Sequence, residues 1–391
     1  MANAFIKRLS VAVCAAFLAA TAAHAAINVP SDGSDGAFNP TSDVTIDLTQ
    51  AVTGTWDQAG TGTGVYDPVK WAVVFKYSSV NISTGVTVSF TNNAFRAPVV
   101  WLVQGDVTIS GTVNLNGQSG GPAGVFAEPG PGAFRGTALS GSAGLGPGGG
   151  LAAGAGAGSY GTKGTHASGP TYGNAMALPL IGGSGGSTVG AAGGGAILIA
   201  AGNGVTVNGS IAARGGYSPC GGGGSGGAIR LLADSLTVGV SASLGAEGDG
   251  GGGAGRIVLE ANQTQISSPS ISPMAAMYVP ADPPRIWPES AAPSVKITRV
   301  GGVNVPADPR ASFDFPKQDI SLATSGAITV GVEATNVPTT WSVVVRTVPK
   351  SGQDTTTNAT LVSGDASASV WEAQVTVPKG FAALQARAFN P

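Results

Sequence analysis

The chain has 391 residues and a formal net charge of −2, and 42% of its residues are hydrophobic while only 10% are charged. High hydrophobicity with little charge excludes a solvated, disordered chain. The near-neutral balance leaves no basic surface for nucleic acid or anionic lipid, so nucleic-acid binding is excluded as a function class.

Residues 1–25 are predicted to be an export signal. Lys7 and Arg8 precede an apolar run that ends in Ala23-His24-Ala25, a small-x-small sequence typical of a cleavage site. The run is too short for a membrane span, and no other apolar run approaches that length. We therefore expect a secreted or cell-surface protein without a transmembrane segment, whose mature chain starts at residue 26.

Few residues are suited to hold a metal. After removal of the signal, Cys220 and His166 are the remaining cysteine and histidine, so neither an intrachain disulfide framework nor a His or Cys metal site is expected. Asp32 and Asp35 each precede a glycine, which favours Asx turns over a calcium site that needs about six or more oxygen ligands. No metal and no cofactor are predicted. Cys220 is interpreted as an inert small residue, with an exposed thiol or an intermolecular disulfide as the alternative.

A repeat organises residues 26–267. Ile197, Ile229 and Ile257 each begin an alternating strand, at spacings of 32 and 28 residues, and the first two copies continue with two more short strands and a glycine tract. Alternation without helical spacing in a repeat of this length predicts a parallel β-helix, or β-solenoid. Earlier units are expected at 99–121 and 73–92, with a capping strand at 44–48.

The strand AIRLLA fixes the predicted inward face. Ile229 and Leu231 are expected to face the core, because Arg230 between them carries the only charge of the strand and should reach water. The same alternation places Arg256 and Glu260 outside. On this register Leu231→Asp should unfold the stack, whereas Arg230→Asp should hardly change the melting temperature.

The repeat is interrupted at about residues 121–193 by a segment rich in glycine, alanine and serine. Ordering a glycine costs about 0.5–1 kcal/mol relative to alanine, so such a tract is either mobile or required by close backbone packing. Apolar anchors such as Phe134 and Tyr160 favour an ordered excursion that packs on itself or on the stack. A disordered excursion is the alternative. If the excursion only leaves and rejoins the stack, deletion of residues 121–181 should leave the stack folded.

Seven prolines between residues 268 and 293 predict an extended linker with few contacts and a domain boundary. Residues 294–391 then alternate in about seven short runs separated by turn residues, which is typical of an immunoglobulin-like or fibronectin-like β-sandwich. Trp341 is its expected core tryptophan, and the sandwich is expected to fold alone. The predicted fold class is all-β, a β-solenoid with a long glycine-rich excursion followed by a β-sandwich.

A succession of distinctive stretches covers most of residues 27–262. They are SDGSDGAFNP, GVTVSF, DVTISGTVNLNG, YGNAMALPLIGGSGG, GGGAILIA, GGAIRLLA and GRIVLEA. This succession resembles a group of uncharacterised glycine-rich proteins secreted by bacteria. The resemblance implies a β-solenoid-like repeat region, a C-terminal immunoglobulin-like domain and export, and it provides no catalytic residue.

The acidic residues do not form a predicted active site. Parallel β-helices that cleave polysaccharides use acidic and basic side chains clustered on one outer face, whereas the acids here fall at different positions of the repeat. A non-enzymatic protein is therefore predicted, with a polysaccharide lyase or hydrolase as the alternative. His166 lies in the glycine excursion and is not expected to belong to a catalytic triad. The acids between residues 101 and 261 are Asp106, Glu128, Asp234, Glu247, Asp249 and Glu260.

Threonine recurs in the middle of the predicted second strand, at Thr87, Thr108, Thr206 and Thr237. Since their apolar neighbours would point inward, these threonines should form an outward column, a candidate surface binding site for ice or flat crystalline polysaccharide. The alternative is that threonine is simply a soluble strand former.

These observations predict an exported, non-catalytic structural or adhesive protein whose partner is a polysaccharide or another surface protein. A carbohydrate-binding or carbohydrate-degrading β-helix is the alternative. A third hypothesis is self-assembly, in which poorly capped solenoid ends stack on one another.

Overall fold

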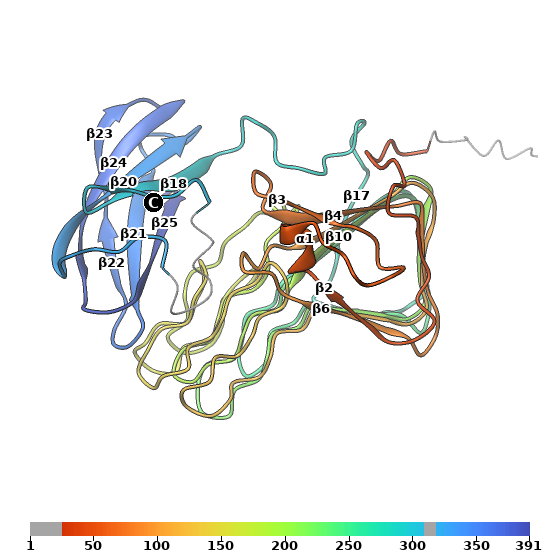
Figure 1. The fold of residues 1–391 in the computed structure, drawn as a ribbon, viewed down its shortest axis with the longest axis horizontal. Helices are drawn as coiled ribbons and strands as arrows, with labels where there is room; N and C mark the ends of the chain where they lie inside the picture. The colour runs from red at the N-terminus through yellow and green to blue at the C-terminus, as the bar shows by residue number, and fades with distance from the viewer. Residues whose placement is uncertain (1–25, 309–317) are drawn as a thin grey trace, which may run out of the picture.

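The computed structural model describes residues 26–308 and 318–391, so the predicted signal peptide lies outside the described residues. The described part of the chain is almost entirely β-structure, with 37% of the described residues in strands and 1% in helix. A short helix, α1, spans Gln50–Thr53. Figure 1 shows a stack of N-terminal strands with long loops (red to green), joined by an extended connector to a smaller set of C-terminal sheets (blue).

The largest sheet contains two columns of parallel strands that share their longest members. In the first column Ile197 pairs with Ile229, and Ile229 pairs with Ile257, so the predicted alignment of the repeat is confirmed. The first column consists of β4 (Ala72–Tyr77), β7 (Val99–Val103), β10 (Ala196–Ala201), β13 (Ala228–Val238), β15 (Arg256–Ile266) and β17 (Ala276–Tyr278).

The chain passes through a second and a third column before it returns to the first. Strands within the columns are parallel, and β3 (Val65–Asp67) adds to β4 in the antiparallel sense. The second column consists of β1 (Ala37–Phe38), β5 (Ser79–Ile82), β8 (Val107–Ile109), β11 (Gly204–Val207) and the second halves of β13 and β15. The third, a separate six-stranded sheet, consists of β2 (Val44–Asp47), β6 (Thr87–Thr91), β9 (Thr112–Asn114), β12 (Ser210–Ala212), β14 (Ser243–Gly245) and β16 (Ser270–Ser272).

The columns enclose a continuous apolar core. Ile229 and Leu231 belong to it and are both 0% exposed, which confirms the predicted inward face. Stacked aromatic rings close the core at its N-terminal end, where the ring centroid of Tyr77 lies 5.3 Å from that of Phe38 and 5.5 Å from that of Phe75. Each buried Leu or Ile contributes about 1.5–3 kcal/mol, so side-chain burial is the main stabilising term here.

The outer face of the first column is buried as well. Arg230 is 0% exposed and Glu260 is 2% exposed, so the prediction that both reach water is wrong. The physical reason is that three distant parts of the chain cover this face and form a second apolar core on it. The covering residues are Ile27, Val29, Tyr160, Ala177, Leu180 and Ile286.

Arg230 and Glu260 neutralise each other within this second core. The Arg230 Nε donates a hydrogen bond to Glu260 on the neighbouring strand, and its Nη2 donates to the backbone carbonyl of Arg285. A buried charge requires such a partner, because an unpaired one costs several kcal/mol. Substitution of Arg230 is therefore expected to destabilise the protein, contrary to the expectation from the sequence.

The glycine-rich segments form one hydrogen-bonded body, which we call the glycine bundle (residues 115–120, 130–170, 182–195, 213–227 and 246–255). In Figure 1 its extended segments run side by side away from the strands. They lack strand pairing, and their amides and carbonyls bond to neighbours on several sides. The segment 221–227 alone exchanges backbone hydrogen bonds with residues 158, 184, 187, 191, 194, 213, 216, 249, 250 and 253.

Close backbone approach explains the glycine content. A Cβ on Gly222 would lie 1.9 Å from the carbonyl oxygen of Gly156, and one on Gly223 would lie 1.7 Å from that of Asp249. No side chain fits such gaps. The prediction of ordered glycine packing is therefore confirmed, and the disordered alternative is wrong for the described excursion. Because Gly158 of the excursion bonds to Gly223 and Gly253, its deletion would remove hydrogen-bond partners from the later repeats.

The proline-rich segment 268–293 is not a linker with few contacts. Its first part adds β16 and β17 to the columns, and Ile286 packs in the second core. The Lys70 ammonium lies 4.6 Å from the centre of the Trp287 ring. The segment therefore belongs largely to the stack.

Two antiparallel sheets follow and enclose a core of their own. Trp371 is buried in this core, whereas Trp341, the expected core tryptophan, is only partly buried at its edge. The five-stranded sheet has the order β19 (Val303–Asn304), β18 (Ser294–Val300), β20 (Gly326–Thr335), β24 (Ala368–Val377) and β23 (Thr360–Gly364). The three-stranded sheet has the order β22 (Thr355–Asn358), β21 (Ser342–Pro349) and β25 (Ala382–Phe389).

The C-terminal sheets contact the glycine bundle through a buried ion pair. The Arg346 Nε donates to Asp354 at 2.8 Å, and Asp354 also accepts a hydrogen bond from the amide of Ala152. The Arg346 Nη1 donates to the carbonyl of Gly146 at 3.4 Å. Since both charged side chains are less than a tenth exposed, this contact fixes the C-terminal sheets to the bundle.

Candidate functional site

Three of the four predicted threonines lie together on the outer side of the second column. Thr108, Thr206 and Thr237 are cross-strand neighbours on β8, β11 and β13. Asn81 and Gln265 extend this line at its two ends. We call these five uncharged polar residues the threonine row.

Thr87 lies elsewhere, so its assignment to this column is wrong. It is on β6 in the third column, where it pairs with Thr112. The second column of that turn is occupied by β5, which has Asn81 in the corresponding place. The stretch VTV at 86–88 resembles the second strands of later units. In this turn, however, β5 forms the second strand, and the VTV stretch belongs to the third.

Thr87 belongs instead to a row of hydroxyl side chains on the third column, which the sequence analysis missed. Each member precedes an inward apolar residue, in TVS, TVN, SIA, SLG and SIS, and this repeated pattern was the signal that could have revealed it. We call this line the hydroxyl row, and it consists of Thr87, Thr112, Ser210, Ser243 and Ser270.

Both rows are regular and uncharged. Neighbouring strands lie about 4.7–4.9 Å apart, so the polar groups repeat at that interval along each row. Val205 and Val207, on either side of the partly exposed Thr206, are 1% and 0% exposed, which directs the threonine side chain outward. Contact with the members of either row therefore strips water from no charge on the row itself.

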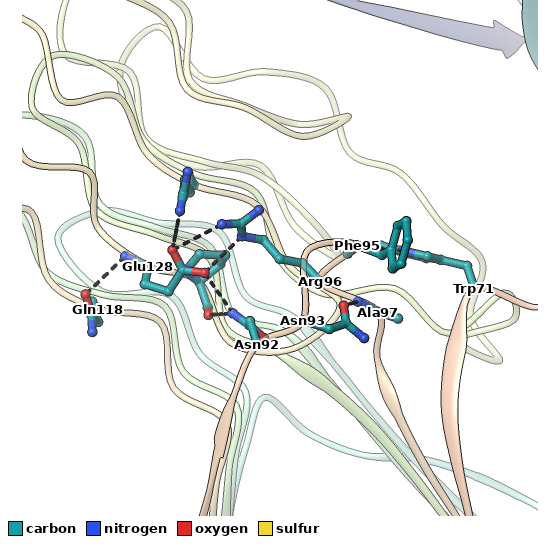
Figure 2. A network of polar contacts seen from close by, with 10 residues as sticks. Trp71, Asn92, Asn93, Phe95, Arg96, Ala97, Gln118 and Glu128 are labelled. Carbon is teal, nitrogen blue, oxygen red and sulfur yellow. Dashed lines mark hydrogen bonds and ion pairs between the residues drawn. The ribbon is translucent and has the colours of Figure 1, made fainter. Parts of the chain in front are cut away.

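Glu128 lies in a polar network at the entry to the glycine bundle (Figure 2). The Arg135 Nη2 donates to its Oε2 at 2.7 Å, and the Arg96 Nε and the Asn92 Nδ2 donate to its Oε1 at 2.9 Å and 3.1 Å. Burial acts to raise the pKa of Glu128, but the charges and hydrogen bonds of Arg96 and Arg135 outweigh it and lower the pKa below its usual value. A carboxylate held ionised is unsuited to general acid catalysis.

Three further acids of the strand columns and the glycine bundle have side-chain partners of their own. Glu260 is paired with Arg230, Glu247 lies 2.7 Å from Arg214, and Asp234 accepts a hydrogen bond from Asn262. In residues 26–308 and 318–391, no group of three or more His, Cys, Asp and Glu side chains is placed to hold a metal ion. Each of these three acids is thus held by a basic or amide side chain of its own.

The remaining sequence candidates lie on the exposed side of the glycine bundle. His166 is exposed in a bend of the excursion, and Cys220 is an exposed free thiol. Neither residue contributes to the two polar rows, which lie on the strand columns. The rows are therefore the candidate functional site.

Comparison with family models, with curated proteins and with solved structures finds no match for this chain. Within the part of the chain that the structure describes, no helix has the length and apolar character needed to cross a membrane.

Proposed function

We propose that this chain is an exported, non-catalytic structural or adhesive protein of the cell surface or extracellular space. In this proposal the strand columns are a β-solenoid, and residues 294–391 are an immunoglobulin-like sandwich. The in-register stacking of successive turns supports the first interpretation. The two antiparallel sheets around a common core support the second.

The threonine row and the hydroxyl row carry the proposal. Each places five uncharged polar side chains at a constant interval on a rigid stack, an arrangement suited to a ligand that is itself repetitive, uncharged and extended. A polysaccharide surface has these properties. The pairing of the acids with basic or amide groups favours binding over cleavage.

Pull-down with insoluble polysaccharides tests this function. The substitution Thr206→Glu interrupts the threonine row, Ser210→Glu interrupts the hydroxyl row, and Thr360→Glu on exposed β23 is the matched control. We expect one of the two row variants to lose at least about tenfold in affinity, which corresponds to about 1.4 kcal/mol. The control should bind like the wild-type protein.

Three results would contradict the proposal. Release of soluble sugar from the polysaccharide would make the protein an enzyme. Equal binding by all three variants, or no binding by the wild-type protein across a panel of polysaccharides, would remove the rows as the adhesive surface.

A further inference from the structure

The C-terminal end of the strand stack has free strand edges. Within residues 26–308 and 318–391, β17 pairs only with β15, β16 pairs only with β14, and residues 263–266 pair only with β13. Each of these strands therefore presents unpaired backbone donors and acceptors on its outer side. Such an edge is a template for another strand.

This end is also uncharged, and it exposes several apolar side chains. From Ala261 to Ala281 the chain contains no charged residue. Natural edge strands are usually protected by charges, so an edge without them that exposes apolar side chains marks an interaction surface. The exposed apolar residues are Ile266 at 37%, Met274 at 91%, Met277 at 54%, Tyr278 at 37% and Val279 at 75%.

The opposite end of the stack has a different character. There the aromatic rings close the core, α1 and the antiparallel β3 lie beside the first turn, and the chain is acidic. Head-to-tail stacking would press an acidic end against an uncharged one, and would take these carboxylates out of water without adding a basic partner, which is costly. The acids of residues 27–71 are Asp32, Asp35, Asp43, Asp47, Asp57 and Asp67.

We propose that the occupant of the open end is a second copy of this chain, paired about a two-fold axis that lies between the two copies of β17. Two identical edges related by a two-fold axis must run antiparallel, and they bring two uncharged surfaces together without like-charge repulsion. Pro273 and Pro280 flank β17 and lack amide donors, so pairing is confined to residues 274–279. The symmetry is closed, so assembly stops at a dimer.

Sedimentation of the purified protein tests this interface. We expect a dimer at micromolar concentration and a folded monomer for Met277→Lys, because Met277 is half exposed in the single chain and the variant loses only the stabilisation that dimer formation adds. Val65→Lys, at the opposite end and 63% exposed, is the matched control and should remain a dimer. A monomeric wild-type protein, a dimeric Met277→Lys variant, or dissociation by Val65→Lys would each overturn the proposal.

A disulfide experiment tests the symmetry. In a Cys220→Ser background, Met277→Cys lies at the centre of β17 and next to its own copy across the two-fold axis. Antiparallel neighbours have Cα atoms about 4.5–5.5 Å apart, within disulfide range. Oxidation should therefore yield covalent dimers. The Cys220→Ser/Val65→Cys protein should stay monomeric under denaturing conditions, and cross-linking through position 65 rather than 277 would contradict a two-fold dimer.

Discussion

The strand columns and the glycine bundle satisfy the same requirement in opposite ways. Every buried amide and carbonyl needs a partner. In the columns each strand bonds to neighbours within a sheet, and apolar side chains fill the space on both faces, as they do around Leu231 and Leu198. In the bundle a segment bonds to neighbours on several sides, so no direction is left for a side chain at its closely packed glycines.

The two regions should therefore fail for different reasons. The columns depend on apolar burial, at about 1.5–3 kcal/mol for each large side chain, and a polar substitution in their core should destabilise them. The bundle depends on many backbone hydrogen bonds of about 0.5–1.5 kcal/mol each, against the entropy cost of ordering glycine. It should be sensitive to added volume, even to a single methyl group.

The largest effect is expected from Leu231→Asp in the columns. This change removes a fully buried apolar side chain, which costs about 2–5 kcal/mol, and adds a buried carboxylate at a further several kcal/mol. Together these costs approach the whole stability of a typical domain. Loss of the cooperative thermal transition should result, while Leu231→Met should cost less than about 1.5 kcal/mol. A folded Leu231→Asp protein would contradict the inward register.

The next effect concerns the outer face of the same column. Arg230→Met leaves Glu260 buried without its ion-pair partner, which should lower the free energy of unfolding by about 3–5 kcal/mol in urea titrations. The double variant Arg230→Met/Glu260→Met removes both charges and should recover most of that loss. An effect of Arg230→Met below about 0.5 kcal/mol would fit the solvent-exposed arginine expected from the sequence.

This arginine illustrates how far the sequence could predict the fold. The alternation of side chains around Ile229 predicted the inward face. The two-residue period of a strand and the position of Arg230 are enough to decide which side chains face the core. The partner of Arg230 lies 30 residues away in sequence, and its cover comes from residues 27, 160, 180 and 286. No local pattern contains that information, so a second buried face was interpreted as a solvated one.

The candidate site was predictable to a similar extent. Thr108, Thr206 and Thr237 occupy equivalent places because each follows the start of its first-column strand by a similar number of residues, and their alignment was correct. Thr87 was misplaced because β5 of its unit lacks a threonine, so the best local match lay one strand further along the chain. The hydroxyl row was missed because its residues are Ser in some turns and Thr in others.

A smaller effect is expected from one methyl group in the bundle. In Gly222→Ala the new Cβ would lie 1.9 Å from the carbonyl oxygen of Gly156, and backbone on both sides leaves little room to relax. We expect a loss of about 3 kcal/mol in unfolding free energy, at the upper part of the range for overpacking. The control is Gly121→Ala, whose Cβ would meet nothing closer than 3.8 Å and should be neutral. Equal stability of the two variants would mean that the bundle is looser than described.

The smallest effect lies at Glu128, where the two regions meet. Glu128 connects Arg96, in the turn before β7, with Arg135 in the glycine bundle. Because Glu128 is about a third exposed, Glu128→Gln should cost only about 1 kcal/mol at pH 7.

The pKa of Glu128 is lowered by folding despite burial. The contribution of Glu128 to the free energy of unfolding is therefore complete above the usual carboxyl pKa and is lost as the pH falls through the lowered value. Urea titrations from pH 7 to pH 3 should therefore show the difference between wild type and Glu128→Gln shrinking toward acid. The pKa values of Asp32 and Asp365 are lowered mainly by hydrogen bonds to Ser34 and Ser367. Both aspartates are present in both proteins, so their effect on stability cancels in the difference between wild type and Glu128→Gln. A difference that stays constant or grows toward pH 3 would contradict an ionised Glu128 as the link between the columns and the bundle.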